Sequence, residues 1–316
     1  MRYLPETMTK QQLRKCYSRY AIAMILYIVG TIGLALLLSW AVQTFLIPVM
    51  QADAVTREKL WYPILQVAVN DVSVYLPGFL VIPPLLAKIP RAEKVPVDRL
   101  MFGEFVQAVL FSMGALYLFA GLTGALVTVI EQVSGIQTSN VVDDFSNMLP
   151  LWLMVLTTVI IAPIVEEVIF RKLMLDRLRG LGDLSAVLLS ALAFALFHTN
   201  LYQFIYAFVL GMIFACVVLI TGSIRDVVVL HMIINGTSVL TGMNLPDFAW
   251  MLFEVFVVLC VLSFFCLFLV NCKKYHLEQG PLSFREGEKL QACLSSPWFW
   301  VMLVGGLTMS VVMIFL

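Results

Sequence analysis

The sequence predicts an all-α protein, a polytopic bundle of about eight or nine transmembrane helices, and two observations carry this prediction. Of the 316 residues, 61% are hydrophobic and 13% are charged, whereas soluble domains are about 45–50% apolar and about 25% charged. Apolar runs long enough to cross a bilayer, about 20 residues each, recur along the whole chain. The composition therefore excludes a water-soluble globular protein.

Nine apolar runs are candidates for these helices, and two of them are short. The runs 184–199 and 226–242 have the length expected of helices that neighbours shelter or that cross only part of the bilayer. We divide the chain into a membrane-spanning region without a motif (1–149), a middle part with the polar motifs described below (150–245) and a C-terminal membrane-spanning region (246–316). The nine runs are about 20–47, 63–87, 104–130, 150–179, 184–199, 202–221, 226–242, 248–271 and 297–316.

The basic residues indicate how the helices are oriented. With the N-terminus inside, alternating connections place 18 of the 20 Lys and Arg residues inside and leave only Arg57 and Lys59 outside. Cytoplasmic loops are enriched in Lys and Arg, so we expect a cytoplasmic N-terminus. Because no organellar targeting signal is visible, we expect an integral protein of a bacterial plasma membrane.

Two adjacent carboxylates stand out in the run 150–179. A charge at the centre of a spanning helix costs about 2.5–3.5 kcal/mol on insertion scales and marks a functional site by default. Glu167 and Arg171 have the i,i+4 spacing and order of a favourable ion pair. Glu166 points about 100° away from Glu167 on the helix and is free to face the bundle. Pro163 removes a backbone donor and predicts a kink.

The alternative is that both acids are merely solvated at the inner edge of the membrane. Histidines elsewhere in the chain argue against it. His198 ends the run 184–199, and His231 and Asn235 lie on one face of the run 226–242. A lone histidine in a helix is more often a packing residue, but a carboxylate, an imidazole, and an imidazole with an amide on three helices are the groups of a hydrolytic site.

These three motifs resemble the signature of the CPBP intramembrane proteases, in the same order and with the same spacing. They read Glu166-Glu167-x-x-x-Arg171, Phe194-x-x-x-His198 and His231-x-x-x-Asn235. The family includes the type II CAAX prenyl endopeptidases and the bacterial proteins once called abortive-infection (ABI) proteins. The resemblance covers about residues 150–245, which we expect to form the catalytic helix core.

The resemblance implies an intramembrane endopeptidase that hydrolyses a peptide bond with a water molecule activated by Glu166. His198 would help to hold or polarise this water. His231 and Asn235 would stabilise the developing oxyanion. The three motifs contain no serine or cysteine that could act as a nucleophile, which favours direct attack by water.

The sequence leaves open whether zinc or another divalent metal takes part. A catalytic zinc takes three protein ligands and keeps one position for water, and Glu166, His198 and His231 could supply them. Glu167 would then be the base. Without a metal, the same three residues would position the water, while Glu167 and Arg171 would support the site.

Depth in the membrane raises a question about this grouping. At 1.5 Å per residue from the inner edge, Glu166 and His198 lie about 20 Å deep, but His231 lies only about 8 Å deep. Either the helix of His231 starts deeper than the run 226–242 indicates, or the site is a cavity that slants toward the cytoplasm.

The expected partners are the lipid bilayer and a peptide or protein substrate presented at the membrane, with no nucleic acid. Two other functions compete with proteolysis. A non-catalytic immunity or scaffold protein of the same family would lack a motif residue, and every motif position is filled. A proton-coupled transporter with Glu166, His198 and His231 as its relay would show paired broken helices in two related halves, and the sequence shows no internal repeat.

Overall fold

The computed structural model is helical throughout the part of the chain that it describes, with no strand there, and confirms the predicted all-α class. Arg57 and Lys59, the two basic residues expected outside, lie beyond the described residues. The described residues are 8–49, 61–92, 95–138, 149–241, 243, 245–271, 277 and 282–315.

The helices follow the predicted apolar runs, with one short helix, α14, that the sequence did not predict. One long helix, Leu151–Leu181, contains α7, α8 and α9 and two π-helical segments, Val155–Ile161 and Val168–Leu175; we call it the α7–α9 helix. The α-helices are α1 (Lys10–Ala41), α2 (Ile47–Val49), α4 (Trp61–Leu86), α5 (Phe102–Ser134), α7 (Leu151–Met154), α8 (Ala162–Glu167), α9 (Asp176–Leu178), α10 (Asp183–Phe197), α11 (Leu201–Thr221), α12 (Arg225–Thr241), α13 (Asp247–Asn271), α14 (Glu286–Leu294) and α15 (Pro297–Val312).

Seven helices in the described ranges are long and apolar enough to cross a membrane. The difference from the nine predicted runs lies in the two short ones. They correspond to α10, with 15 residues, and α12, with 17, and both fall short of the roughly 20 residues that a full crossing needs.

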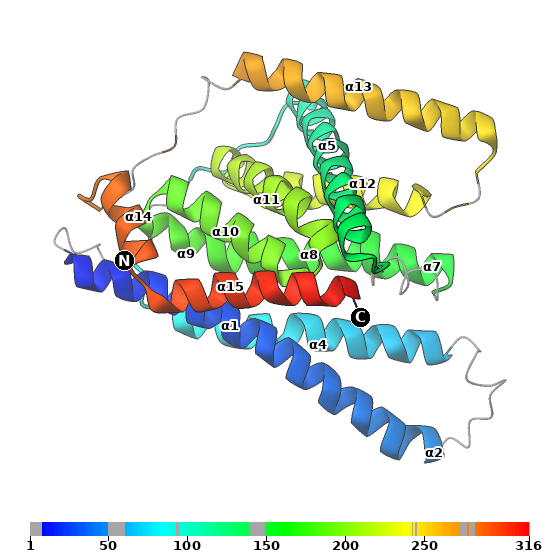
Figure 1. Ribbon diagram of the computed structural model, residues 1–316. Helices are drawn as coiled ribbons and strands as arrows, with labels where there is room; N and C mark the ends of the chain where they lie inside the picture. Colours follow the sequence, from blue (N-terminus) through cyan, green and yellow to red (C-terminus); the bar gives the residue numbers. More distant parts are fainter. Residues whose placement is uncertain are drawn as a thin grey trace.

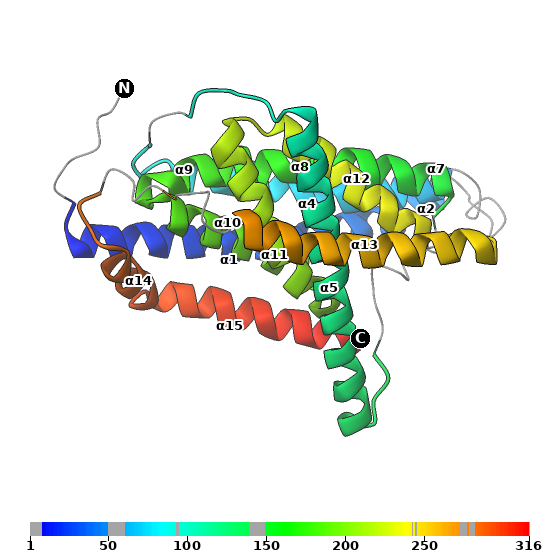
Figure 2. The ribbon, with the colours of Figure 1, turned by 90° about the horizontal axis from the view of Figure 1, so that it is seen from above.

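The helices form a bundle in which neighbouring helices pack closely against one another. Figure 1 shows α1, α4 and α15 together along one side, with α8, α10 and α11 in the middle, and Figure 2 shows α5 crossing the other long helices. Glycines permit two of these contacts: a Cβ on Gly78 of α4 would lie 2.8 Å from the Tyr27 ring of α1, and one on Gly114 of α5 would lie 2.2 Å from the Cys260 carbonyl of α13. Only a glycine allows so close an approach.

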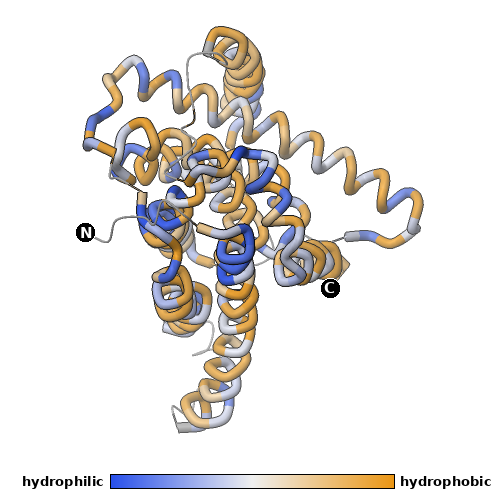
Figure 3. Tube along the Cα trace, turned by 90° about the vertical axis from the view of Figure 1, so that its left-hand side faces the viewer, coloured by the Kyte–Doolittle hydropathy of each residue, from blue (hydrophilic) through white to orange (hydrophobic). Residues whose placement is uncertain are grey.

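The outer surface is apolar, as a lipid-facing surface must be. α13 packs against α5 but leaves most of its length exposed, including Val258, Leu262 and Leu269. In Figure 3, hydrophobic residues cover most of the described trace, while hydrophilic stretches gather at the end that faces the viewer, where α1 begins. The bundle thus has an apolar middle and a polar end.

Candidate active site

The α7–α9 helix is π-helical over Val155–Ile161, shortly before its two glutamates, and a proline follows this segment. The N–H of Ala162 bonds to the Thr157 carbonyl, five residues back, in the π-helical pattern. The next bond of this pattern would join Pro163 to the Thr158 carbonyl, but proline has no N–H. The side chain of Asn235 takes its place, because Nδ2 donates to the Thr158 carbonyl at 2.9 Å. Asn235 of α12 therefore supplies a donor to the carbonyl that Pro163 leaves without a backbone partner, and the kink at this proline stays a prediction.

Glu167 and Arg171 form the ion pair that their spacing predicts. The Nε atom of Arg171 lies 3.1 Å from Oε2 of Glu167, and both side chains are 0% exposed. The guanidinium also lies over the rings of Phe194, 4.8 Å from the centroid, and Phe214, 5.7 Å away. Nη1 donates to Ser190 Oγ at 3.4 Å. A cation on two aromatic faces, paired with a carboxylate, is a rigid support for neighbouring groups.

His231 joins this pair to Glu166. Its Nδ1 lies 3.0 Å from Oε1 of Glu167, and its Nε2 lies 3.8 Å from Oε2 of Glu166. A carboxylate paired with Arg171 can only accept a hydrogen bond, so Nδ1 carries a proton and Nε2 faces Glu166. The distance of 3.8 Å exceeds a hydrogen bond and allows a water molecule to contact both atoms.

Glu166 and His231 meet in this structure although the count from the inner edge gave them different depths, since Nε2 of His231 lies 3.8 Å from Oε2 of Glu166. The two explanations, a helix that starts deeper than the run 226–242 indicates and a cavity that slants toward the cytoplasm, stay predictions.

Glu166 is buried, 7% exposed, like Glu167 at 0%, so solvated acids at the membrane edge are excluded. Its Oε1 accepts a hydrogen bond of 3.4 Å from the hydroxyl of Tyr75 on α4. One turn earlier on α4, the Asp71 carboxylate accepts from Thr157 Oγ1 at 3.0 Å. The sequence analysis missed Tyr75, although a carboxylate and a tyrosine at i,i+4 in an apolar helix were a signal that this face of α4 meets polar groups.

His198 lies at the end of α10, where the chain turns. Its Nδ1 donates to the Phe194 carbonyl at 2.7 Å, because a carbonyl can only accept, and its Nε2 is left as an acceptor. Thr199, the next residue, has a positive φ of 45°, which is uncommon for a residue other than glycine. Asn200 then caps α11, with its side chain accepting from the Tyr202 N–H at 2.9 Å. The turn fixes the position of the imidazole.

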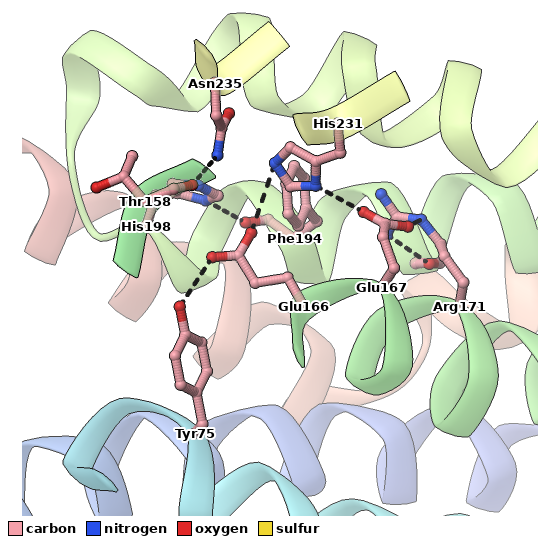
Figure 4. Close-up of polar contacts among 10 residues, drawn as sticks. Tyr75, Thr158, Glu166, Glu167, Arg171, Phe194, His198, His231 and Asn235 are labelled. Carbon is pink, nitrogen blue, oxygen red and sulfur yellow. Dashed lines mark hydrogen bonds and ion pairs between the residues drawn. The ribbon is translucent and has the colours of Figure 1, made fainter. Parts of the chain in front are cut away.

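The three motifs therefore lie close together, some through direct contacts and others through the ring of Phe194. Glu166 and His231 approach one another directly, and the ring of Phe194 packs edge-to-face against both imidazoles, 4.8 Å from that of His198 and 5.8 Å from that of His231. Figure 4 shows these side chains with Asn235 above them. The Asn235 nitrogen donates one of its two N–H groups to the Thr158 carbonyl, and its role in binding an oxyanion stays a prediction.

The two histidines suggested as metal ligands share one feature with known zinc ligands. Both histidines bind an acceptor through Nδ1 and leave Nε2 free, a pattern found in zinc ligands. Yet among the described residues no three His, Cys, Asp or Glu side chains are grouped to hold a metal ion. Glu167, which the zinc arrangement needs as a base, is instead engaged by Arg171 and His231. The zinc set Glu166, His198 and His231 stays a prediction.

Comparison with known families supports the resemblance. Residues 148–237 match the family model described as type II CAAX prenyl endopeptidase Rce1-like. The match covers less than a third of the chain but includes all three motifs. The similarity of this segment to the type II CAAX prenyl endopeptidases supports the CPBP/CAAX protease family and, at the level of the family, an intramembrane protease. No curated protein matched the chain, and no solved structure matched it.

Proposed function

We propose that the protein is an intramembrane endopeptidase that cleaves a peptide or protein presented at the membrane, with Glu166 as the base that activates water. The observation that carries the proposal is the buried Glu166 carboxylate, which faces Nε2 of His231 at 3.8 Å inside an apolar bundle. A positioned carboxylate contributes about 10²–10⁴-fold to a hydrolysis as a general base.

Glu166, His198 and His231 each act in this reaction. Glu166 takes a proton from the attacking water while the water oxygen bonds to the peptide carbonyl carbon, and later returns the proton to the leaving amine. His198 accepts a hydrogen bond from the same water through Nε2, because its Nδ1–H is donated to the Phe194 carbonyl. When Nε2 of His231 carries a proton, it donates to the oxyanion. Glu167 and Arg171 hold the imidazole of His231 in place.

The side of the membrane from which the substrate arrives follows from the charges. We propose that the N-terminus is cytoplasmic and that the membrane is a bacterial plasma membrane. The described basic residues at the end of the α7–α9 helix, Lys172, Arg177 and Arg179, support this orientation through the excess of Lys and Arg in cytoplasmic loops.

The test of the proposal is a cleavage assay on full-length protein in proteoliposomes, with candidate membrane peptides followed by mass spectrometry. We expect cleavage to continue at an unchanged rate after treatment with a chelator, because Glu167 is engaged by Arg171 and His231. Loss of cleavage with chelator and recovery with added zinc would instead support the zinc arrangement. No cleavage of any peptide by wild-type protein would favour a non-catalytic immunity or scaffold protein.

Tyr75 provides a second test of the role of Glu166. We expect Tyr75→Phe to lower kcat for peptide cleavage about tenfold with little change in KM, because the hydroxyl that positions the Glu166 carboxylate is lost. Thermal stability should change by less than about 1.5 kcal/mol, the net value of one hydrogen bond. Tyr62→Phe, on the same helix but remote from Glu166, is the matched control. An unchanged kcat for Tyr75→Phe would show that α4 does not position the base.

A further inference from the structure

A second polar site lies outside the active site, at the end of the bundle where α9 lies. A cavity of about 520 Å³ is bounded by the segment after α4, the end of the α7–α9 helix and the end of α11. This volume is within the roughly 300–1,000 Å³ range of small-molecule sites. Four of its lining residues are basic and one is acidic: Arg91, Lys172, Arg177, Arg179 and Asp176.

Two of these cations are paired with acids among the described residues, and the other two are not. Lys172 pairs with Asp176 at 3.1 Å, and Arg179 pairs with an acid outside the cavity, Asp183, at 3.2 Å. Arg91 and Arg177 have no ion pair among the described residues and repel one another, while Asp176 attracts Arg177 without forming an ion pair with it. An anion between two positive charges attracts both and offsets their repulsion. Guanidinium groups bind phosphate oxygens in a bidentate manner, so a phosphate is a suitable anion.

The rest of the cavity is apolar. Pro83 of α4, Leu173 of the α7–α9 helix, and Val218 and Leu219 of α11 line it, and these helices are candidates to span the membrane. A free anion makes no favourable contact with these apolar side chains. A phospholipid carries a phosphate and acyl chains together, so it can contact both the basic and the apolar residues. Basic pockets between spanning helices are sites for anionic headgroups.

We propose that this cavity binds the headgroup phosphate of an anionic phospholipid, with Arg91 and Arg177 as the phosphate ligands. Leu173 and Lys172 follow Arg171 directly in the chain, so a lipid bound here stabilises the same helix that carries Glu166. The proposal does not depend on proteolysis, since its test measures binding.

The test is a thermal-melting titration of the full-length protein in a neutral detergent with short-chain phosphatidylglycerol. A ligand that binds only the folded state raises Tm with its concentration. We expect phosphatidylglycerol to raise Tm, and we expect the apparent Kd to increase at least tenfold in the double variant R91Q/R177Q. The charge-preserving double variant R91K/R177K should bind more tightly than R91Q/R177Q, and Arg99→Gln, an exposed arginine that does not line the cavity, should bind like wild type.

Three results would overturn the proposal. Equal binding by wild type and R91Q/R177Q would place the lipid elsewhere. An equal rise in Tm with short-chain phosphatidylcholine would show that the anionic charge is not recognised. A full rise in Tm with inorganic phosphate alone, lost in R91Q/R177Q, would identify a free phosphate in place of a lipid. The Tm of each variant without ligand separates these outcomes from a folding defect.

Discussion

Glu166→Gln is expected to reduce peptide cleavage by about 10²–10⁴-fold, the full contribution of a general base, while leaving Tm close to that of wild type. Glutamine has the shape of glutamate but cannot take a proton from water. Its amide oxygen still accepts the hydrogen bond that Tyr75 gives to Oε1. The only ion-pair contact of Glu166 in the described structure is His231 at 3.8 Å, so little stabilising interaction is lost.

The control for this variant is a glutamate of a spanning helix that lies far from the site. Glu254 is exposed on α13, at the outer edge of the bundle, and Glu254→Gln should cleave at the wild-type rate. Cleavage by Glu166→Gln at a rate within threefold of wild type would contradict the assignment of Glu166 as the base. A large fall in Tm for this variant would show that its carboxylate has a structural role that the contacts do not reveal.

Local spacing predicted the contacts within one helix, because helix geometry alone decides them. Glu167 and Arg171 lie four residues apart, and the pair forms as expected at 3.1 Å. The three motifs also come together, through the approach of His231 to Glu166 and the packing of Phe194 against both imidazoles. Spacing along the sequence does not predict which atoms meet across helices. His231 lies 64 residues from Glu167, yet its Nδ1 contacts Glu167 and its Nε2 faces Glu166.

The contacts that the sequence did not predict all join helices whose relative positions are set by packing. Tyr75 reaches Glu166 over a separation of 91 residues, and Asn235 reaches Thr158 over 77. The second contact has a reason in the backbone, since Pro163 leaves a carbonyl without a donor, but the identity of the donor depends on where α12 packs.

Glu167→Gln is expected to have the largest effect on stability. Arg171 is 0% exposed, and removing the charge of its partner leaves a buried cation unpaired, which costs about 3–5 kcal/mol. Typical unfolding free energies are only about 5–15 kcal/mol, so Tm in detergent should fall markedly. Cleavage should persist in part below this Tm, because the glutamine oxygen still accepts from Nδ1 of His231.

The double variant E167Q/R171M distinguishes loss of the charge pair from loss of a catalytic group. Replacing both members of a buried pair with uncharged side chains of similar size is often neutral for stability, so Tm should recover toward the wild-type value. If Glu167→Gln were stable but inactive, while Glu166→Gln were unstable with partial activity, the roles would be reversed. That result would make Glu167 the base and favour a metal held by Glu166, His198 and His231, and it would require Arg171 to find another partner.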